Sequence, residues 1–205
     1  MILEIVPVGM LAANCYIIGC EDTKMGLMID PGGDALNLLS KIKKLDLNIK
    51  YIILTHGHHD HIGAVNEIKK KTNALIAIHE LDKEMLKDEN NLENNIGRKI
   101  TIASYDIDLK DGDKLSIGNI NLKIIHTPGH SPGGISILTD GAVFTGDTLF
   151  AGSIGRTDFY KGNMEDILYS IRNKLFTLPE DTKVYPGHGP ASTIKREKNT
   201  NPFFI

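Results

Sequence analysis

The sequence has only two cysteines and no apolar run of the roughly 18 residues needed to cross a bilayer. Cys15 and Cys20 are too few to build a disulfide framework for 205 residues, so we expect free thiols in a reducing compartment. The N-terminus lacks the basic start of a signal peptide, and Glu4 and Pro7 interrupt its apolar stretch. These features predict a cytoplasmic protein without a membrane segment.

Basic stretches and low-complexity tracts are also missing. The 23 lysines and arginines are dispersed along the chain against 26 acidic residues, so neither nucleic acid nor an anionic membrane is an expected partner. With 41% hydrophobic and 24% charged residues, the chain can bury a sizeable core and does not resemble a disordered protein. It has no phosphate-binding loop, complete dinucleotide fingerprint or C-x-x-C pair. We expect a monomer or small homo-oligomer that binds a small-molecule substrate.

Apolar runs and turn signals divide the chain into short strands and a few helices. Strands that follow in runs, with helices between them, favour two packed sheets with helices outside over one doubly wound sheet. No linker interrupts the pattern, so residues 1–205 are predicted to form one domain. Helices are expected at 35–45, 62–71 and 164–176, and strands at 2–8, 15–18, 26–29, 51–54, 75–78, 114–117, 121–126, 135–138, 142–145 and 183–185.

Histidine is the informative residue type, because four of the eight histidines fall between positions 56 and 61. In an extended strand His56 and His58 share a face and can present two imidazoles together. Asp60 and His61 then come from the turn that enters the next helix. Three imidazoles and a carboxylate suit zinc, or iron or manganese in a similar shell. His59 is expected to point away from the metal.

Three further candidate ligands lie downstream, each at a strand end beside glycine or proline. They are His130 in TPGHSPG, Asp147 in FTGDT and His188 in YPGHGP. Glycine and proline fix unusual backbone angles and so hold a side chain at a set angle over the sheet edge. Each of these residues alone would be weak evidence, because a single histidine or aspartate in a loop is usually structural. Together with the histidine cluster they indicate a metal site.

The motif His56-x-His58-x-Asp60-His61, together with His130, Asp147 and His188, resembles the complete ligand set of the metallo-β-lactamase superfamily. The resemblance covers nearly the whole chain, and it implies an αββα sandwich of two mixed β-sheets flanked by helices, with two metal ions at one sheet edge. It implies that one ion is held by His56, His58 and His130. It assigns the other ion to Asp60, His61 and His188, with Asp147 as the bridge.

Within this superfamily, the GDTLF segment from Gly146 and the GRTDF segment from Gly155 resemble the hydroxyacylglutathione hydrolase (glyoxalase II) branch, and in particular its short bacterial members. The resemblance implies hydrolysis of S-lactoylglutathione or a related acyl thioester, with Arg156 and Tyr160 as substrate-binding residues. An equal alternative pairs Arg156 with Asp158 to brace the loop. The larger enzymes have a C-terminal helical domain that supplies much of the glutathione site. We expect no counterpart of that domain here, so the resemblance does not decide whether glutathione is recognised.

The implied chemistry is consistent with the charges of the site. Two divalent ions, the carboxylates of Asp60 and Asp147 and a bridging hydroxide leave a net charge of about +1, and a bridging water should lose its proton near neutral pH. The hydroxide is then the nucleophile, and Asp60 and Asp147 are catalytic through the ions. A thiolate with a pKa of about 8.5 leaves with little help from an acid. Zinc is the expected metal, with iron or manganese as alternatives.

Other interpretations weigh less. A persulfide dioxygenase with a single iron is the main alternative, because the GRTDF segment resembles that family too. A metal-binding module without turnover would not need an open, bridged site. A serine hydrolase is excluded because Pro132 lacks the backbone N–H that an oxyanion hole would require after Ser131. Asp30 either orients a ligand histidine or only forms a turn.

Overall fold

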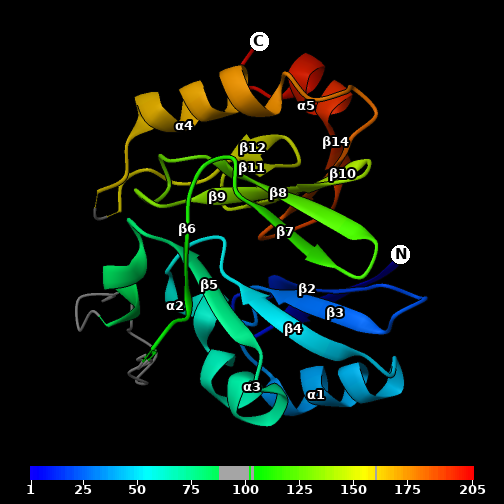
Figure 1. Ribbon diagram of the computed structural model, residues 1–205. Coiled ribbons are helices and arrows are strands. Elements are labelled where there is room, and N and C mark those ends of the chain that lie inside the picture. Colours follow the sequence, from blue (N-terminus) through cyan, green and yellow to red (C-terminus); the bar gives the residue numbers. More distant parts are fainter. Residues whose placement is uncertain (88–101, 103, 160) are drawn as a thin grey trace.

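Two β-sheets pack face to face, with helices on both outer sides (Figure 1). The computed structural model describes residues 1–87, 102, 104–159 and 161–205. Both sheets are mixed, so the predicted αββα sandwich is confirmed. In the described part of the chain no helix is long and apolar enough to span a membrane.

The first sheet has six strands in chain order. The first three pair antiparallel and the next three are added in parallel. Helices α1 (Ala35–Lys44) and α3 (Val65–Thr72) make crossovers between parallel strands and cover the outer face of this sheet. The strands are β1 (Ile2–Val8), β2 (Ala13–Gly19), β3 (Met25–Ile29), β4 (Asn48–Ile53), β5 (Leu75–His79) and β6 (Ile107–Leu109).

The second sheet has the order β14-β13-β10-β9-β8-β7, and only β10 and β13 pair in parallel. Its outer face is covered by α4 (Met164–Ser170), a π-helical turn over Ile171–Leu175 and α5 (Ile194–Thr200). A hairpin of β11 (Leu149–Phe150) and β12 (Ser153–Ile154) follows β10. The sheet strands are β7 (Lys114–Ile117), β8 (Ile120–His126), β9 (Ile135–Thr139), β10 (Ala142–Gly146), β13 (Lys183–Pro186) and β14 (Ser192–Thr193).

Strand β2 shows how the sequence builds two core layers from one strand. Successive side chains point to opposite faces, so Cys15 and Ile17 pack with the α1 and α3 layer, while Tyr16 and Ile18 pack between the sheets. All of β2 is buried, which agrees with the apolar run that the sequence shows at 15–18. A third apolar cluster lies between the second sheet and the helices α4 and α5.

The helix predicted for 62–71 is interrupted, which corrects the expectation. A short helix, α2 (His59–Ile62), ends before α3 begins, and the backbone N–H of Ala64 donates to the carbonyl of Pro31 (2.8 Å). The DPGG turn from Asp30 therefore packs against the junction of α2 and α3. Strand β6, strand β14 and helix α5 are short elements that the apolar pattern did not indicate, because each offers too few residues for a periodic signal.

Candidate metal centre

The predicted ligands all follow strand ends at one edge of the sandwich. The histidine cluster follows β4, Asp147 follows β10 and His188 follows β13, three strands that have parallel neighbours, whereas His130 follows the antiparallel strand β8. The expectation that His56 lies in an extended strand is wrong, since β4 ends at Ile53. The expectation for Asp60 is also corrected, because it lies within helix α2.

One group of three histidines comes together as predicted. The candidate ligand atoms of His56, His58 and His130 all lie within 4.8 Å of one another. Nδ1 of His58 is 2.8 Å from Nε2 of His130. Nδ1 of His130 lies 2.7 Å from the carbonyl oxygen of Arg156, so a proton there donates to that carbonyl and leaves Nε2 unprotonated as the candidate ligand atom.

A second group joins both halves of the chain. Nε2 of His188 lies 3.1 Å from Oδ2 of Asp60, and Nε2 of His61 lies 3.5 Å from the same oxygen. The candidate ligand atoms of these three residues again fall within 4.8 Å of one another. An imidazole–carboxylate set of this kind suits a divalent first-row metal ion.

Asp147 faces both groups. Its Oδ2 lies 3.7 Å from Nε2 of His130 and 3.6 Å from Nε2 of His188, and its Oδ1 lies 3.4 Å from Nε2 of His61. Gly187 makes room for this carboxylate, because a Cβ at that position would lie 2.0 Å from Oδ1 of Asp147. Asp147 therefore lies between the two groups, and its role as a bridge stays a prediction.

Orphaned polar atoms show that the site fits a metal. Buried ring nitrogens and a buried carboxylate oxygen are costly unless they find a partner. Among the described residues, four buried side-chain atoms have no hydrogen-bond partner: Nε2 of His56, His59 and His61, and Oδ1 of Asp147. Three of the four belong to predicted ligands. Metal coordination would satisfy those three atoms, and ligation by the seven residues stays a prediction until ions are measured.

The two groups differ in their electrostatics. Burial and the neighbouring histidines lower the pKa of His58 to about 3 and hold the pKa of His56 well below its usual range, so both imidazoles are neutral. In the second group, burial opposes a charge on His61, but the carboxylates of Asp147, Asp60 and Asp30 outweigh it and raise the pKa to about 10. The hydrogen bond to Asp60 likewise raises the pKa of His188. The carboxylates around the second group thus favour a positive charge at this part of the site.

Asp30, whose role was open between orienting a ligand and forming a turn, touches a predicted ligand. Its Oδ2 lies 2.9 Å from Nδ1 of His61 and accepts a 2.6 Å hydrogen bond from the hydroxyl of Thr55. Its Oδ1 accepts the backbone N–H of Thr55 (2.7 Å). Asp30 therefore fixes the ring of His61 so that Nε2 points at Asp60 and Asp147.

Asp82 is a site residue that the sequence analysis missed. Its buried carboxylate accepts hydrogen bonds from the backbone N–H of Gly57 (3.2 Å), the hydroxyl of Ser131 (2.6 Å) and the backbone N–H of Gly133 (2.5 Å). It thereby joins the loop of His56 and His58 to the loop of His130. Nothing local marks Asp82, because it lies in a charged segment that resembles an ordinary exposed loop.

Asn14 also escaped the sequence analysis. Its side-chain amide donates to the carbonyls of Pro186 (3.0 Å) and Gly189 (2.9 Å), and its backbone N–H donates to Gly187 (2.7 Å). The hydroxyl of Tyr16 donates to Pro186 as well (2.5 Å). Strand β2 of the first sheet therefore holds the loop that carries His188 from the second.

The predicted substrate side is only partly described. Arg156 forms the alternative ion pair, with Nη2 lying 2.8 Å from Oδ2 of Asp158, and both side chains are exposed. Its guanidinium also stacks on Phe159, whose ring lies 5.4 Å from that of His58. Tyr160 lies outside the described residues, and a substrate-binding role for Arg156 stays a prediction.

Comparison with known proteins agrees with this geometry. The model of the metallo-beta-lactamase superfamily matches residues 8–188, a span that contains all seven predicted ligands. The chain belongs to the metallo-β-lactamase superfamily. Its His and Asp groups, in this superfamily, imply divalent metal ions and a hydrolase.

Several superfamily members are similar along their whole length. A curated relative, hydroxyacylglutathione hydrolase GloC of Haemophilus influenzae, is 40% identical, over 99% of this chain and 98% of its own. The solved structure of BLEG-1 B3 metallo-beta-lactamase is 39% identical with a TM-score of 0.94 and full coverage of both chains. The protein TTHA1623, solved in a di-iron-bound form, is 32% identical with a TM-score of 0.88, over 98% of this chain and 99% of its own. The names of these relatives differ, so they do not identify the substrate of this chain. The substrate has to be inferred from the site.

Proposed function

We propose that this metallo-hydrolase cleaves small acyl thioesters of the hydroxyacylglutathione type, with two divalent ions in the candidate centre. The observation that carries the proposal is the position of Asp147, whose single carboxylate faces His130 of one group and His188 of the other. A carboxylate that faces both groups can bridge two ions, and we therefore propose that each group holds one ion. The name of the curated relative GloC supports hydroxyacylglutathione chemistry.

Two bound ions would supply a water that is deprotonated near neutral pH and a Lewis acid for the substrate carbonyl. The residues of the chain set the geometry for this chemistry. Asp30 and the carbonyl of Arg156 hold the Nδ1 atoms of His61 and His130, so that both Nε2 atoms point inward. A thiolate leaving group is stable enough to depart without a dedicated acid, which matches a site with no further acid assigned.

The nature of the ions is part of the proposal. Imidazole nitrogens and carboxylate oxygens suit zinc, and they also suit iron or manganese. The di-iron-bound form of TTHA1623 supports iron as a real alternative to zinc for a chain of this kind. We propose two ions for each chain and zinc as the first candidate.

Elemental analysis and a thioester assay test the proposal. We expect two ions for each chain, hydrolysis of S-D-lactoylglutathione or another short acyl thioester, and loss of activity after dialysis against a chelator. Asp147→Asn should bind fewer ions and lose at least about 100-fold in kcat. A full rate in Asp147→Asn would exclude the bridged mechanism.

The single-iron persulfide dioxygenase remains the competing proposal, and the same preparation separates the two. It requires one iron for each chain and consumption of oxygen with glutathione persulfide. One iron together with oxygen consumption would replace the hydrolase proposal. Two ions, thioester hydrolysis and no oxygen consumption would exclude the dioxygenase.

A further inference from the structure

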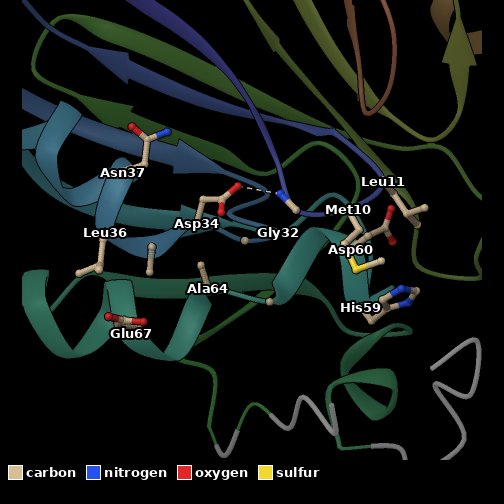
Figure 2. Close-up of a pocket in the computed structure, with 14 residues that line it drawn as sticks. Met10, Leu11, Gly32, Asp34, Leu36, Asn37, His59, Asp60, Ala64 and Glu67 are labelled. Carbon is tan, nitrogen blue, oxygen red and sulfur yellow. Dashed lines mark hydrogen bonds between the residues drawn. The ribbon is translucent and has the colours of Figure 1, made fainter. Parts of the chain in front are cut away.

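A cleft of about 640 Å³ opens beside the metal centre. It lies between the loop joining β1 to β2, the start of α1 and the junction of α2 with α3. Figure 2 shows Asp60, His59, Met10 and Leu11 at one end of the cleft and Leu36 at the other. Because Asp60, a member of the second group of predicted ligands, is among its lining residues, this cleft, named here the Met10–Leu36 cleft, borders the candidate centre.

The loop over the cleft is fixed in place. The backbone N–H of Gly9 donates to Oδ2 of Asp34 at the start of α1 (2.9 Å), as the dashed line in Figure 2 shows. The carbonyl of Leu11 lies 3.2 Å from Nδ1 of His188, which ties the other side of the loop to the centre. The cleft is therefore a formed feature of the fold, within the size range of small-molecule sites.

The walls of the cleft are apolar and carry only negative charge. Met10 and Leu11 at one end and Leu36 at the other expose 82%, 53% and 77% of their surface, so the cleft offers apolar side chains at both of its ends. The charged residues along the described lining are acidic, Asp34 and Glu67 together with Asp60, and no lysine or arginine is among them. Such walls favour a neutral apolar group and repel an anion.

The opposite side of the centre has a different character. Phe159 lies against the rings of His58 and His130, and the Arg156 guanidinium stacks on it. A substrate held at the centre would thus have an aromatic and cationic side near the first group of ligands. Its other side would be the apolar, acidic cleft near the second group.

We propose that the Met10–Leu36 cleft binds the acyl chain of the substrate, and that this chain is neutral, apolar and longer than lactoyl. The inference rests on the proposed thioesterase function and specifies its substrate class. In the reaction, water adds its oxygen to the acyl carbon, the C–S bond breaks, and a carboxylic acid and a thiol leave without any oxidant or reductant. The thiol part then lies toward Phe159.

A series of N-acetylcysteamine thioesters tests the cleft, because the thiol part stays constant and uncharged. From acetyl through butanoyl and hexanoyl to octanoyl, we expect kcat/KM to rise about two- to fourfold for each added methylene, the upper value being that of a fully buried CH₂. Glutaryl, whose chain ends in a carboxylate, should be hydrolysed more slowly than the equally long pentanoyl, because Asp34 and Glu67 repel it.

Variants locate the effect. Met10→Gln should lower kcat/KM for the hexanoyl and octanoyl thioesters. Leu36→Gln, at the far end of the cleft, should lower kcat/KM for the octanoyl thioester more than for the hexanoyl thioester. Leu75→Gln is the matched control, because Leu75 is also exposed (40%) but begins β5, at the end of the sheet opposite the histidine cluster. It should leave the whole series unchanged.

The outcomes separate the two proposals. If acetyl thioester is hydrolysed but kcat/KM stays flat or falls with chain length, the cleft inference is wrong and the proposed function stands. If no thioester is hydrolysed, the proposed function fails, and calorimetric binding of octanamide, a neutral probe, still tests the cleft. Binding that Leu36→Gln weakens supports the cleft, and absence of binding overturns it.

Discussion

Oδ2 of Asp30 lies 2.9 Å from Nδ1 of His61, and neither side chain is exposed to solvent by more than 2%. The same carboxylate accepts two hydrogen bonds from Thr55, directly after β4. Asp30 directly follows β3, and β3 and β4 are parallel neighbours. The carboxyl ends of two adjacent parallel strands thereby fix the orientation of one predicted ligand.

Replacing Asp30 by asparagine should weaken metal binding in the second group. Asparagine offers one acceptor oxygen where the carboxylate offers two, and its amide would face a donor from Thr55 or His61. We expect affinity for the more weakly bound ion to fall roughly 10- to 100-fold, measured by competition with a chromophoric chelator. Asp181→Asn, at an exposed position, is the control. Unchanged affinity in Asp30→Asn would show that Asp30 only forms a turn.

Asp82→Asn should loosen the two loops that carry the first group. Three donors converge on this buried carboxylate, and an asparagine cannot accept from all of them. We expect the free energy of unfolding to fall by about 1–3 kcal/mol, measured by urea denaturation. Ser131→Ala, which removes one of the three donors, should cost less. Equal stability of wild type and Asp82→Asn would contradict the role assigned to Asp82.

Gly187→Ala should displace the Asp147 carboxylate. A Cβ at position 187 would lie 2.0 Å from Oδ1 of Asp147 and 2.8 Å from Cε1 of His61. Because a displacement of about 1 Å in a catalytic group can cost about 100-fold, we expect a loss of that order in kcat. The control is Gly112→Ala, whose Cβ meets nothing within 4 Å. Its backbone φ of +84° should cost some stability without changing kcat.

His79 should make stability depend on pH. Its ring stacks on that of His126 with centroids 4.1 Å apart, and burial together with the charge of His126 lowers its pKa to about 4, against the partial opposition of Glu80, Asp111 and Asp113. The unfolded chain, with an ordinary histidine pKa near 6.5, then binds the proton more tightly. Stability is therefore full above about pH 6.5 and falls as the pH drops toward 4.

His79→Phe tests this dependence, because phenylalanine keeps a stacked ring but cannot bind a proton. The difference in unfolding free energy between wild type and His79→Phe should shift in favour of the variant between pH 7 and 4. A difference that stays constant over this range would show that His79 does not titrate with a lowered pKa.

The predicted strands agree with the structure because their signals are local. Residues 2–8 form the edge strand β1, and the apolar runs within β2 and β4 reflect a sheet that is covered on both faces. The interrupted helix before α3 was beyond the pattern. Its apolar spacing continues across the break, where the backbone N–H of Ala64 donates to the carbonyl of Pro31 in a separate part of the chain.

The sequence alone determined which side chains are the candidate metal ligands. The candidate ligands, from His56 to His188, can be recognised from their residue types and from their positions after apolar runs. These two features indicate a metal site before the fold is known. Tertiary structure decided what orients those ligands and what lies beside them. Asp82 reaches Gly133 across 51 positions and Asn14 reaches Pro186 across 172, contacts set only by how the two sheets pack. Local sequence patterns indicate burial and turns. Contacts such as these two depend on how elements distant in the sequence pack together, which no local pattern shows.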